Sequence, residues 1–153
     1  MSSSDQNMLF RELIMDHYQH PRNKGLVGDK SYKTVHLKNP SCGDDITVQI
    51  KLDEEHTIED CRHMGSGCAI CCSSASMMSE LLKNKSADDA MEAVKHFKWM
   101  VSGEPFDEEL LDECISLHGV TNVPPRINCA TLAWNAAEAG ILQLTEDPAE
   151  TDE

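Results

Sequence analysis

The sequence predicts an α+β fold, in which a small three-stranded antiparallel sheet forms early in the chain and several helices pack around it. Two observations support this prediction. Apolar and polar residues alternate within residues 35–64, whereas apolar residues after residue 67 recur at helical spacing. The chain has 153 residues, shows no internal repeat and contains no long linker. This length is sufficient for one hydrophobic core, so we expect residues 1–153 to form a single domain.

A first helix is expected before the sheet. Ser4 or Asp5 can cap its start, because a side-chain oxygen there accepts a hydrogen bond from an otherwise unpaired backbone N–H group. Apolar residues then lie along one side of the helix as far as Tyr18. Pro21 follows and ends the helix.

Three strands follow this helix. Residues 35–38 alternate apolar with polar side chains, and residues 46–52 do so over a longer run. Residues 53–56 are expected to form a hairpin turn, after which residues 57–64 return as the third strand. The three strands together form the antiparallel sheet.

Four helices are expected after the sheet. The first begins at Cys68 and ends near Leu82. Ser86 and Asp89 resemble a capping box in front of the second, which Gly103 ends. Helices that follow strands in this way pack on one face of the sheet.

The third and fourth of these helices occupy most of the remaining chain. Asp107 can cap the third helix, which Gly119 closes. Two prolines at 124–125 precede the fourth helix, which Gly140 closes. Residues 145–153, TEDPAETDE, are expected to form a disordered acidic tail.

The charge of the chain excludes some classes of partner. It carries 13 Lys and Arg against 27 Asp and Glu, a formal net charge of −14. A surface of this sign repels phosphate backbones and anionic lipids, so we expect no nucleic-acid partner and no membrane surface. No targeting segment or membrane span is visible, so we expect a cytoplasmic protein with reduced thiols. Seven cysteines in that compartment indicate metal binding or sulfur chemistry.

Three of the cysteines occupy backbone positions that favour a thiolate. Cys42 lies in a turn between two expected strands, Cys68 opens a helix, and Cys129 lies in the first turn of the last helix. Unpaired N–H groups and the positive end of the helix dipole stabilise an anion at such positions. Three converging thiolates would need a cation such as Zn²⁺, with Asp44 as the nearest oxygen donor. Backbone context alone leaves a shared metal site and inert burial as equal alternatives.

The other four cysteines do not lie in a turn or at the first residue of a helix. Cys61 falls within a strand pattern and Cys114 on the apolar stripe of a helix, so we interpret both as core residues. Cys71 and Cys72 lie three and four residues after Cys68, on nearly the same helix face. We interpret them as packing neighbours. The alternatives are a metal-binding or redox CxxC pair, a spare sulfur site and a resolving thiol for a persulfide.

Four motifs carry a resemblance to a known family. They are LIMDHYQHPRNKG at 13–25, NPSCGD at 39–44, GSGCAI with SSASMM within 65–78, and PPRINCATLAW at 124–134. In this order they resemble the SufU branch of the IscU/SufU family of iron–sulfur cluster assembly proteins, which is related to NifU N-terminal domains. The resemblance runs from about residue 8 to residue 142, nearly the whole chain.

The resemblance implies a compact α+β fold and a metal site formed by Cys42, Asp44, Cys68 and Cys129. Zinc typically occupies this site in the SufU branch, and the alternative is an Fe–S cluster on the same ligands. IscU-like chains have a histidine directly before the last cysteine, whereas this chain has Asn128. An amide oxygen is a poor zinc ligand, so Asp44 is the expected fourth ligand.

The resemblance also implies a function. A SufU-like protein is a zinc-dependent sulfurtransferase that activates a PLP-dependent cysteine desulfurase (SufS-like), accepts its persulfide sulfur and passes the sulfur on to downstream Fe–S assembly proteins. Cys42 matches the acceptor position, and its release from the metal would accompany transfer. Arg126 matches a basic residue that could pair with Asp44 or stabilise a persulfide anion. The alternative for Arg126 is an ordinary surface arginine.

Three other functions stay open. The first is a scaffold on which a nascent Fe–S cluster is assembled and then transferred to apo-proteins. The second is a purely structural zinc domain. The third is a cysteine hydrolase that uses Cys42, which is disfavoured because no His/Asn pair in recognisable spacing accompanies this thiol. Asn128 and the SufU-like length of the segment between Cys68 and Cys129 favour the sulfurtransferase over the scaffold.

Overall fold

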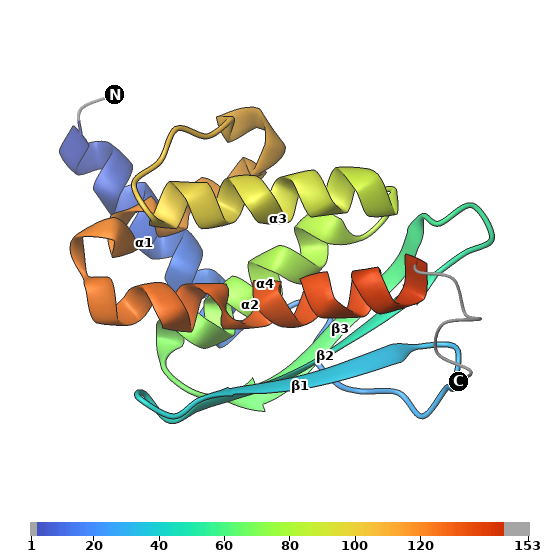
Figure 1. Cartoon of the computed structure of the whole chain (residues 1–153). Coiled ribbons are helices and arrows are strands. Elements are labelled where there is room, and N and C mark those ends of the chain that lie inside the picture. The colour runs from blue at the N-terminus through green and yellow to red at the C-terminus, as the bar shows by residue number, and fades with distance from the viewer. Residues whose placement is uncertain (1–2, 146–153) are drawn as a thin grey trace.

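A computed structural model of the chain describes residues 3–145 (Figure 1). The predicted tail at 145–153 therefore lies outside the described residues, except for Thr145. Within the described part the elements follow one another in this order: α1 (Ser3–Gln19), β1 (Lys33–Asn39), β2 (Asp44–Leu52), β3 (Ile58–Ser66), α2 (Ala69–Leu82), α3 (Ala87–Val101), η1 (Glu108–Leu110), η2 (Asp112–Asn122) and α4 (Pro124–Thr145).

The sheet is antiparallel with the order β1-β2-β3, which confirms the predicted α+β fold. Val35 pairs with Val48 across β1 and β2, and Ile50 pairs with Cys61 across β2 and β3. Residues opposite each other lie on the same face, so these pairs form an apolar surface for the helices. The hairpin turn is confirmed as well, because the Asp53 N–H donates to the carbonyl of Thr57 at 2.9 Å.

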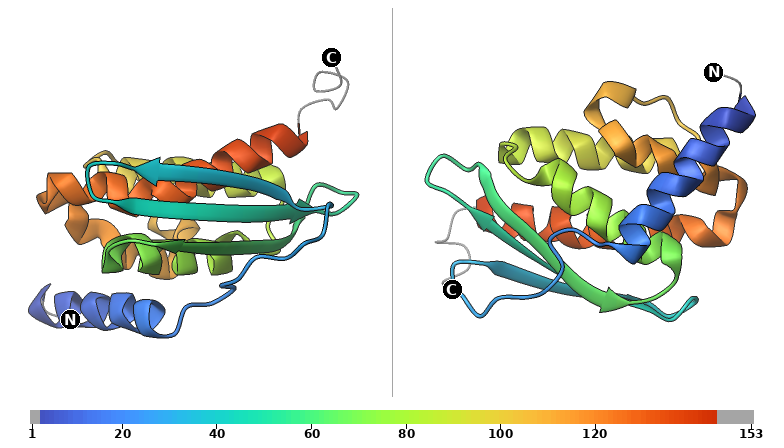
Figure 2. Two further views of the ribbon diagram at one scale, coloured as in Figure 1. Left: turned by 90° about the horizontal axis from the view of Figure 1, so that it is seen from below. Right: turned by 180° about the vertical axis from the view of Figure 1, so that it is seen from behind.

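The helices cover one face of the sheet, as the left view of Figure 2 shows. α4 packs on β1 and β2, α2 packs on β3, and α3 packs on the outer side of α4. Trp134 of α4 stacks on Phe97 of α3 with ring centroids 4.0 Å apart, and its Nε1–H donates to Ser74 Oγ of α2 at 2.8 Å. These contacts join α2, α3 and α4 into one core. Among residues 3–145, no helix is both long and apolar enough to span a bilayer.

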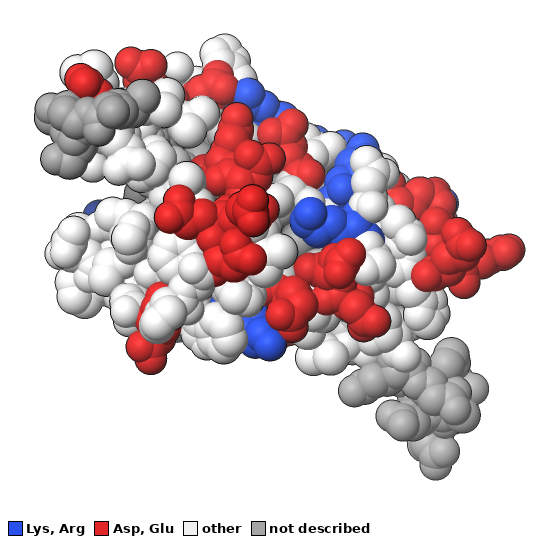
Figure 3. All heavy atoms as spheres, turned by 90° about the horizontal axis from the view of Figure 1, so that it is seen from above, with Lys and Arg blue, Asp and Glu red and all other residues white. Residues whose placement is uncertain are grey.

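Acidic residues dominate the face seen from above in Figure 3. α3, η1 and the segment between them contribute exposed carboxylates to the surface: Asp88, Asp89, Glu92, Glu104, Asp107, Glu108 and Glu109. Part of the acidic excess of the sequence therefore lies on the surface formed by α3, η1 and the segment between them.

Most predicted element boundaries are confirmed within two residues. α1 begins at Ser3, so Asp5 lies in its first turn and not before it. α2 begins at Ala69, and Cys68 is its N-cap residue with an extended backbone. Ser86 caps α3 as predicted, because its Oγ accepts from the Asp89 N–H at 3.1 Å.

The predicted helix after Asp107 is not an α-helix. Two 3₁₀ segments, η1 and η2, replace it and run past Gly119 to Asn122. Leu111 separates the two segments, and Asp112, the first residue of η2, has a positive φ of 49°. The apolar side chains that face the core recur every three residues, at Leu111, Cys114, Leu117 and Val120. A 3₁₀ helix has three residues per turn, so this spacing aligns them on one side, whereas an α-helix would spread them around its axis.

The last helix is longer than predicted at both ends. α4 begins at Pro124, because proline lacks only an N–H group that would have no intrahelical partner in the first turn. It also continues through Gly140 to Thr145. Gly140 is buried where α4 crosses the sheet, and a Cβ there would contact side chains of Val35 and Ile50. Gly140 therefore lies at a packing contact and does not end the helix.

Candidate metal centre

The turn between β1 and β2 positions Cys42. The backbone N–H groups of Cys42 and Gly43 both donate to the carbonyl of Asn39, at 3.2 and 2.9 Å. Gly43 has a φ of +74°, a conformation that glycine adopts without strain. The turn leaves Cys42 half-buried at the end of the sheet and places Asp44 at the first position of β2.

Asp44 is a buried carboxylate, with only 1% of its surface exposed. Its Oδ1 accepts from the backbone N–H of Cys68 at 3.1 Å, and its Oδ2 lies 3.4 Å from Nδ2 of Asn39. A Cβ added at Gly67 would collide with this carboxylate. The glycine before Cys68 is therefore needed so that Asp44 can approach the start of α2.

Cys129 approaches Asp44 and Cys42 from α4. It lies in the first turns of the helix and is fully buried. Its Sγ lies 3.9 Å from the carbonyl oxygen of Pro125, and the Sγ of Cys42 lies 3.8 Å from the same oxygen. Nδ2 of Asn39 lies 3.8 Å from Sγ of Cys129. The carbonyl of Pro125 thus borders both thiols, and the amide of Asn39 borders Cys129.

The ligand atoms of Cys42, Asp44 and Cys129 all lie within 4.8 Å of one another. The Sγ of Cys68 is outside this set, but its thiol also faces Cys129. Burial raises the pKa of Cys129, and the neighbouring Asp44, Cys42 and Cys68 raise it further. Thiols with anionic neighbours in a buried site need a cation to become thiolates together. The donor set of sulfur and carboxylate oxygen therefore fits zinc. We call these four residues the thiol centre.

Arg126 lies on the exposed side of the thiol centre. Contact with Cys129 and the negative charge of Cys68 raise the pKa of its guanidinium group. Within residues 3–145 no ion pair joins Arg126 to Asp44, so the observed contact is to sulfur and not to the carboxylate. Asn128 is exposed on the surface of α4.

The remaining cysteines do not share one environment. Cys61, Cys71 and Cys114 are buried in the core, as predicted, and burial is the main cause that raises the pKa of each thiol. Cys72 is only half-buried, and its Sγ lies 3.8 Å from the carbonyl oxygen of Gly67. It also borders a small cavity beside Lys24, so packing alone does not describe it.

Asn39 and the carbonyl of Pro125 are neighbours of the thiols that were not predicted. Asn39 pairs with Asp44 across β1 and β2, so the register of this hairpin places its amide beside the carboxylate. The motif NPSCGD contained the signal, because an asparagine that directly precedes a turn of this kind faces the first residue after it. No side-chain pattern in the sequence could have identified a backbone carbonyl.

The chain is similar to known proteins over nearly its whole length. Residues 9–150 match the model of the NifU-like N terminal domain family. The zinc-dependent sulfurtransferase SufU of Bacillus subtilis is 42% identical over 134 residues, which is 87% of this chain and 89% of that protein. The iron–sulfur cluster assembly scaffold protein IscU of Streptococcus pyogenes is 38% identical over 143 residues, which is 92% of this chain and 87% of that protein.

Solved structures share the fold. The crystal structure of a putative iron–sulfur cluster assembly scaffold protein for the SUF system, from Fervidobacterium islandicum, superposes with a TM-score of 0.81 at 32% identity. The superposition covers 88% of this chain and 98% of that one. The three-stranded sheet and the helices that cover it are therefore shared with experimentally determined structures.

Proposed function

Because the chain belongs to the family of NifU-like N-terminal domains, we propose that it is an iron–sulfur cluster assembly protein with zinc-dependent sulfurtransferase activity. It accepts persulfide sulfur from a PLP-dependent cysteine desulfurase and passes this sulfur on for Fe–S cluster biogenesis. The proposed location is the cytoplasm, where thiols stay reduced, and all seven cysteines are free thiols.

One observation carries this proposal. Cys42, Asp44 and Cys129 come from a turn, a strand and a helix that are far apart in the sequence, yet their ligand atoms lie within 4.8 Å of one another. Cys68 adds a third thiol beside them. Zinc, when bound, would supply the positive charge that holds these thiols as thiolates.

The thiols differ in how a partner could reach them. Cys129 is fully buried and Asp44 nearly so, whereas Cys42 is half-buried in a turn at the end of the sheet. Buried residues hold a metal well but cannot meet a second protein. Cys68 is half-buried like Cys42, and Cys42 is the proposed sulfur acceptor because it also matches the acceptor position of SufU-like proteins. Arg126, exposed beside the same thiols, is the proposed partner of the negative charge on the transferred sulfur.

The transfer itself is a thiol–disulfide type exchange. The thiolate of Cys42 attacks the outer sulfur of the donor persulfide, and a new S–S bond forms on Cys42. The S–S bond of the donor breaks, and the donor cysteine leaves as a thiolate. The outer sulfur keeps its proton or its charge throughout, so no oxidant or reductant is consumed.

The proposal is tested by comparing Asp44→Ala with the neighbouring variant Asp45→Ala. Asp44 is buried in the thiol centre, whereas Asp45 pairs with His36 at 2.6 Å on the exposed face of the sheet. We expect Asp44→Ala to lose most of its zinc and its stimulation of the desulfurase, and Asp45→Ala to retain both. Unchanged zinc content in Asp44→Ala would rule out Asp44 as a ligand.

The acceptor role has its own test. Cys42→Ala should take up no persulfide sulfur, measured by mass spectrometry after reaction with a desulfurase and cysteine. Cys72→Ala, which removes another half-buried thiol, should accept sulfur as the wild type does. Normal sulfur uptake by Cys42→Ala would contradict the proposal.

A second function, assembly of a cluster on the same ligands, is favoured by the similarity to proteins named as scaffolds. The two functions differ in what the purified protein holds. About one equivalent of zinc without visible colour supports sulfur transfer, whereas a brown protein with iron and inorganic sulfide supports the scaffold.

A further inference from the structure

A second group of potential metal ligands lies at the other end of α2, away from the thiol centre. His17 from α1, Glu80 from α2 and Glu113 from η2 present ligand atoms that all lie within 4.8 Å of one another. The Nε2 of His17 is 3.1 Å from Oε1 of Glu113 and 3.9 Å from Oε1 of Glu80. We call these three residues the His17 cluster.

His17 is the buried member of this cluster, with 1% of its surface exposed. Its Nδ1 lies 2.8 Å from Oγ of Ser76, which fixes the plane of the ring. The opposite nitrogen, Nε2, points at both carboxylates. A histidine whose far nitrogen is oriented by a hydrogen bond, and whose near nitrogen faces carboxylates, has the arrangement typical of a metal ligand.

The position of the proton on His17 decides whether Nε2 can bind a cation. Oγ of Ser76 also accepts from the backbone N–H of Arg22 at 2.8 Å. A hydroxyl oxygen has two lone pairs, so it can accept from both Arg22 and Nδ1–H of His17. In that tautomer the lone pair of Nε2 faces the carboxylates. In the other tautomer Nε2–H donates to Glu113, and the cluster is a metal-free hydrogen-bonded contact between α1 and η2.

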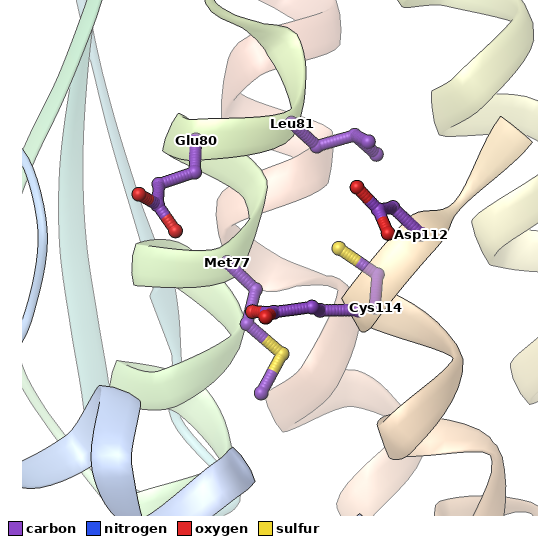
Figure 4. A pocket seen from close by; sticks show the side chains of 6 residues that line it. Met77, Glu80, Leu81, Asp112 and Cys114 are labelled. Carbon is purple, nitrogen blue, oxygen red and sulfur yellow. The ribbon is translucent and has the colours of Figure 1, made fainter.

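The charges around the cluster favour a cation. Figure 4 shows Asp112 on η2 with its carboxylate directed toward the space between η2 and α2, and Glu80 of α2 also borders this space. This space is an open hollow of about 270 Å³, also bordered by Glu113. The nearest cationic side chain, Arg22, is 4.0 Å from Glu80 and is engaged by Asp16 at 2.6 Å. Glu80 and Glu113 thus share one guanidinium group, which Asp16 already engages.

We propose that His17, Glu80 and Glu113 form a second metal site, which binds a divalent first-row cation such as Mn²⁺ or Fe²⁺. One imidazole and two carboxylates suit these ions better than they suit a soft thiophilic ion. The half-exposed glutamates, 48% and 51% accessible, leave room for water molecules to complete the coordination. The bound cation would join α1, α2 and η2.

The proposal is tested with Mn²⁺, whose free ion gives a six-line EPR signal that decreases when the ion binds. Mn²⁺ prefers nitrogen and oxygen donors, so the result does not depend on the occupant of the thiol centre. We expect the full-length wild type to bind one Mn²⁺. Glu113→Gln and Glu80→Gln should each weaken this binding at least about tenfold, because each removes a charged ligand.

Two further variants keep the test specific. Glu59→Gln removes a carboxylate that pairs with Lys51 on the sheet, and it should bind Mn²⁺ as the wild type does. Ser76→Ala removes the partner that orients His17, together with the acceptor of the Arg22 backbone N–H, and it should weaken binding by about 10-fold to 100-fold without removing a ligand. Glutamine can still accept a hydrogen bond from His17, so the Glu113→Gln protein is expected to remain folded.

The location of the ion provides a second measurement. Bound Mn²⁺ should broaden the NMR signals of the Met77 methyl group, which borders the hollow, before those of residues near Cys42. Absence of Mn²⁺ binding to the wild type, or wild-type binding by both glutamine variants, would overturn the proposal. The cluster would then be a metal-free hydrogen-bonded contact between α1 and η2. Neither outcome would affect the sulfur-transfer assays of Cys42→Ala.

Discussion

The thiol centre and the His17 cluster lie near opposite ends of α2, and they are built in different ways. Cys68 precedes the first turn of α2, and Glu80 lies in its last turn. The thiol centre takes its residues from a turn, the first residue of a strand and the starts of two helices, where the backbone fixes each position. The His17 cluster takes its residues from the sides of helices and has only one buried member. A site fixed by backbone should fail abruptly when changed, and a site made of long side chains should weaken gradually.

The largest expected effect is at Gly67. Gly67→Ala places a methyl group against the carboxylate of Asp44, which would push this carboxylate out of the thiol centre. We expect zinc to be lost and the free energy of unfolding to fall by about 1–3 kcal/mol, as overpacking of a tight site usually costs. Metal analysis and urea unfolding measure the two effects.

Gly119→Ala is the matched control for this variant. A Cβ at Gly119 would meet no atom within 4 Å, and this residue lies in η2 and is not part of the thiol centre. We expect the zinc content and the unfolding free energy of Gly119→Ala to equal those of the wild type. Equal zinc content in Gly67→Ala and the control would show that the backbone does not fix this site.

An effect on stability alone, without a loss of zinc, is expected when each region is changed in protein freed of metal by a chelator. His17→Ala removes a buried ring that is hydrogen-bonded to α2 and η2, so it should lower the free energy of unfolding by about 1–3 kcal/mol. Cys42→Ala changes a half-buried turn residue and should alter the free energy of unfolding by about 0.5 kcal/mol or less. Equal losses, measured by urea unfolding, would remove the distinction between the two regions.

The smallest effect concerns pH and the core thiol of Cys61. Burial raises the pKa of Cys61 to about 12. A group whose pKa is raised by folding stabilises the protein fully below its ordinary pKa, near 9 for a thiol, and this contribution is lost as the pH rises toward the folded value. The urea midpoint should therefore fall more steeply between pH 9 and about 11 for the wild type than for Cys61→Ala. Parallel curves would contradict this assignment.

The fold was largely predictable from the sequence because local signals and tertiary packing agree. The alternation in residues 46–52 matches a strand with one buried face, and Ser86 caps α3 as its position indicates. The fourth helix was predicted too short, since Gly140 looks like a helix end when its packing partners on the sheet are unknown. Tertiary contact overrides helix propensity there.

The two candidate metal sites were not equally predictable. Turn and helix-start positions identified Cys42, Cys68 and Cys129 as thiols suited to a metal, and family motifs indicated that they share it with Asp44. No such signal pointed to His17, because Glu80 and Glu113 lie 63 and 96 positions after it in the sequence and share no motif with it. Only the packing of α1 against α2 and η2 brings these side chains together.

The spacing of buried residues in η2 limits how the length of this segment can vary. Each residue of a 3₁₀ helix turns the chain by about 120°. Removal of one residue would therefore rotate the buried apolar side chains that follow it away from α2 and α3. Removal or insertion of three residues would restore Leu117 and Val120, or their equivalents, to the same side. Insertions and deletions in this segment should therefore be tolerated in steps of three and rejected in steps of one or two.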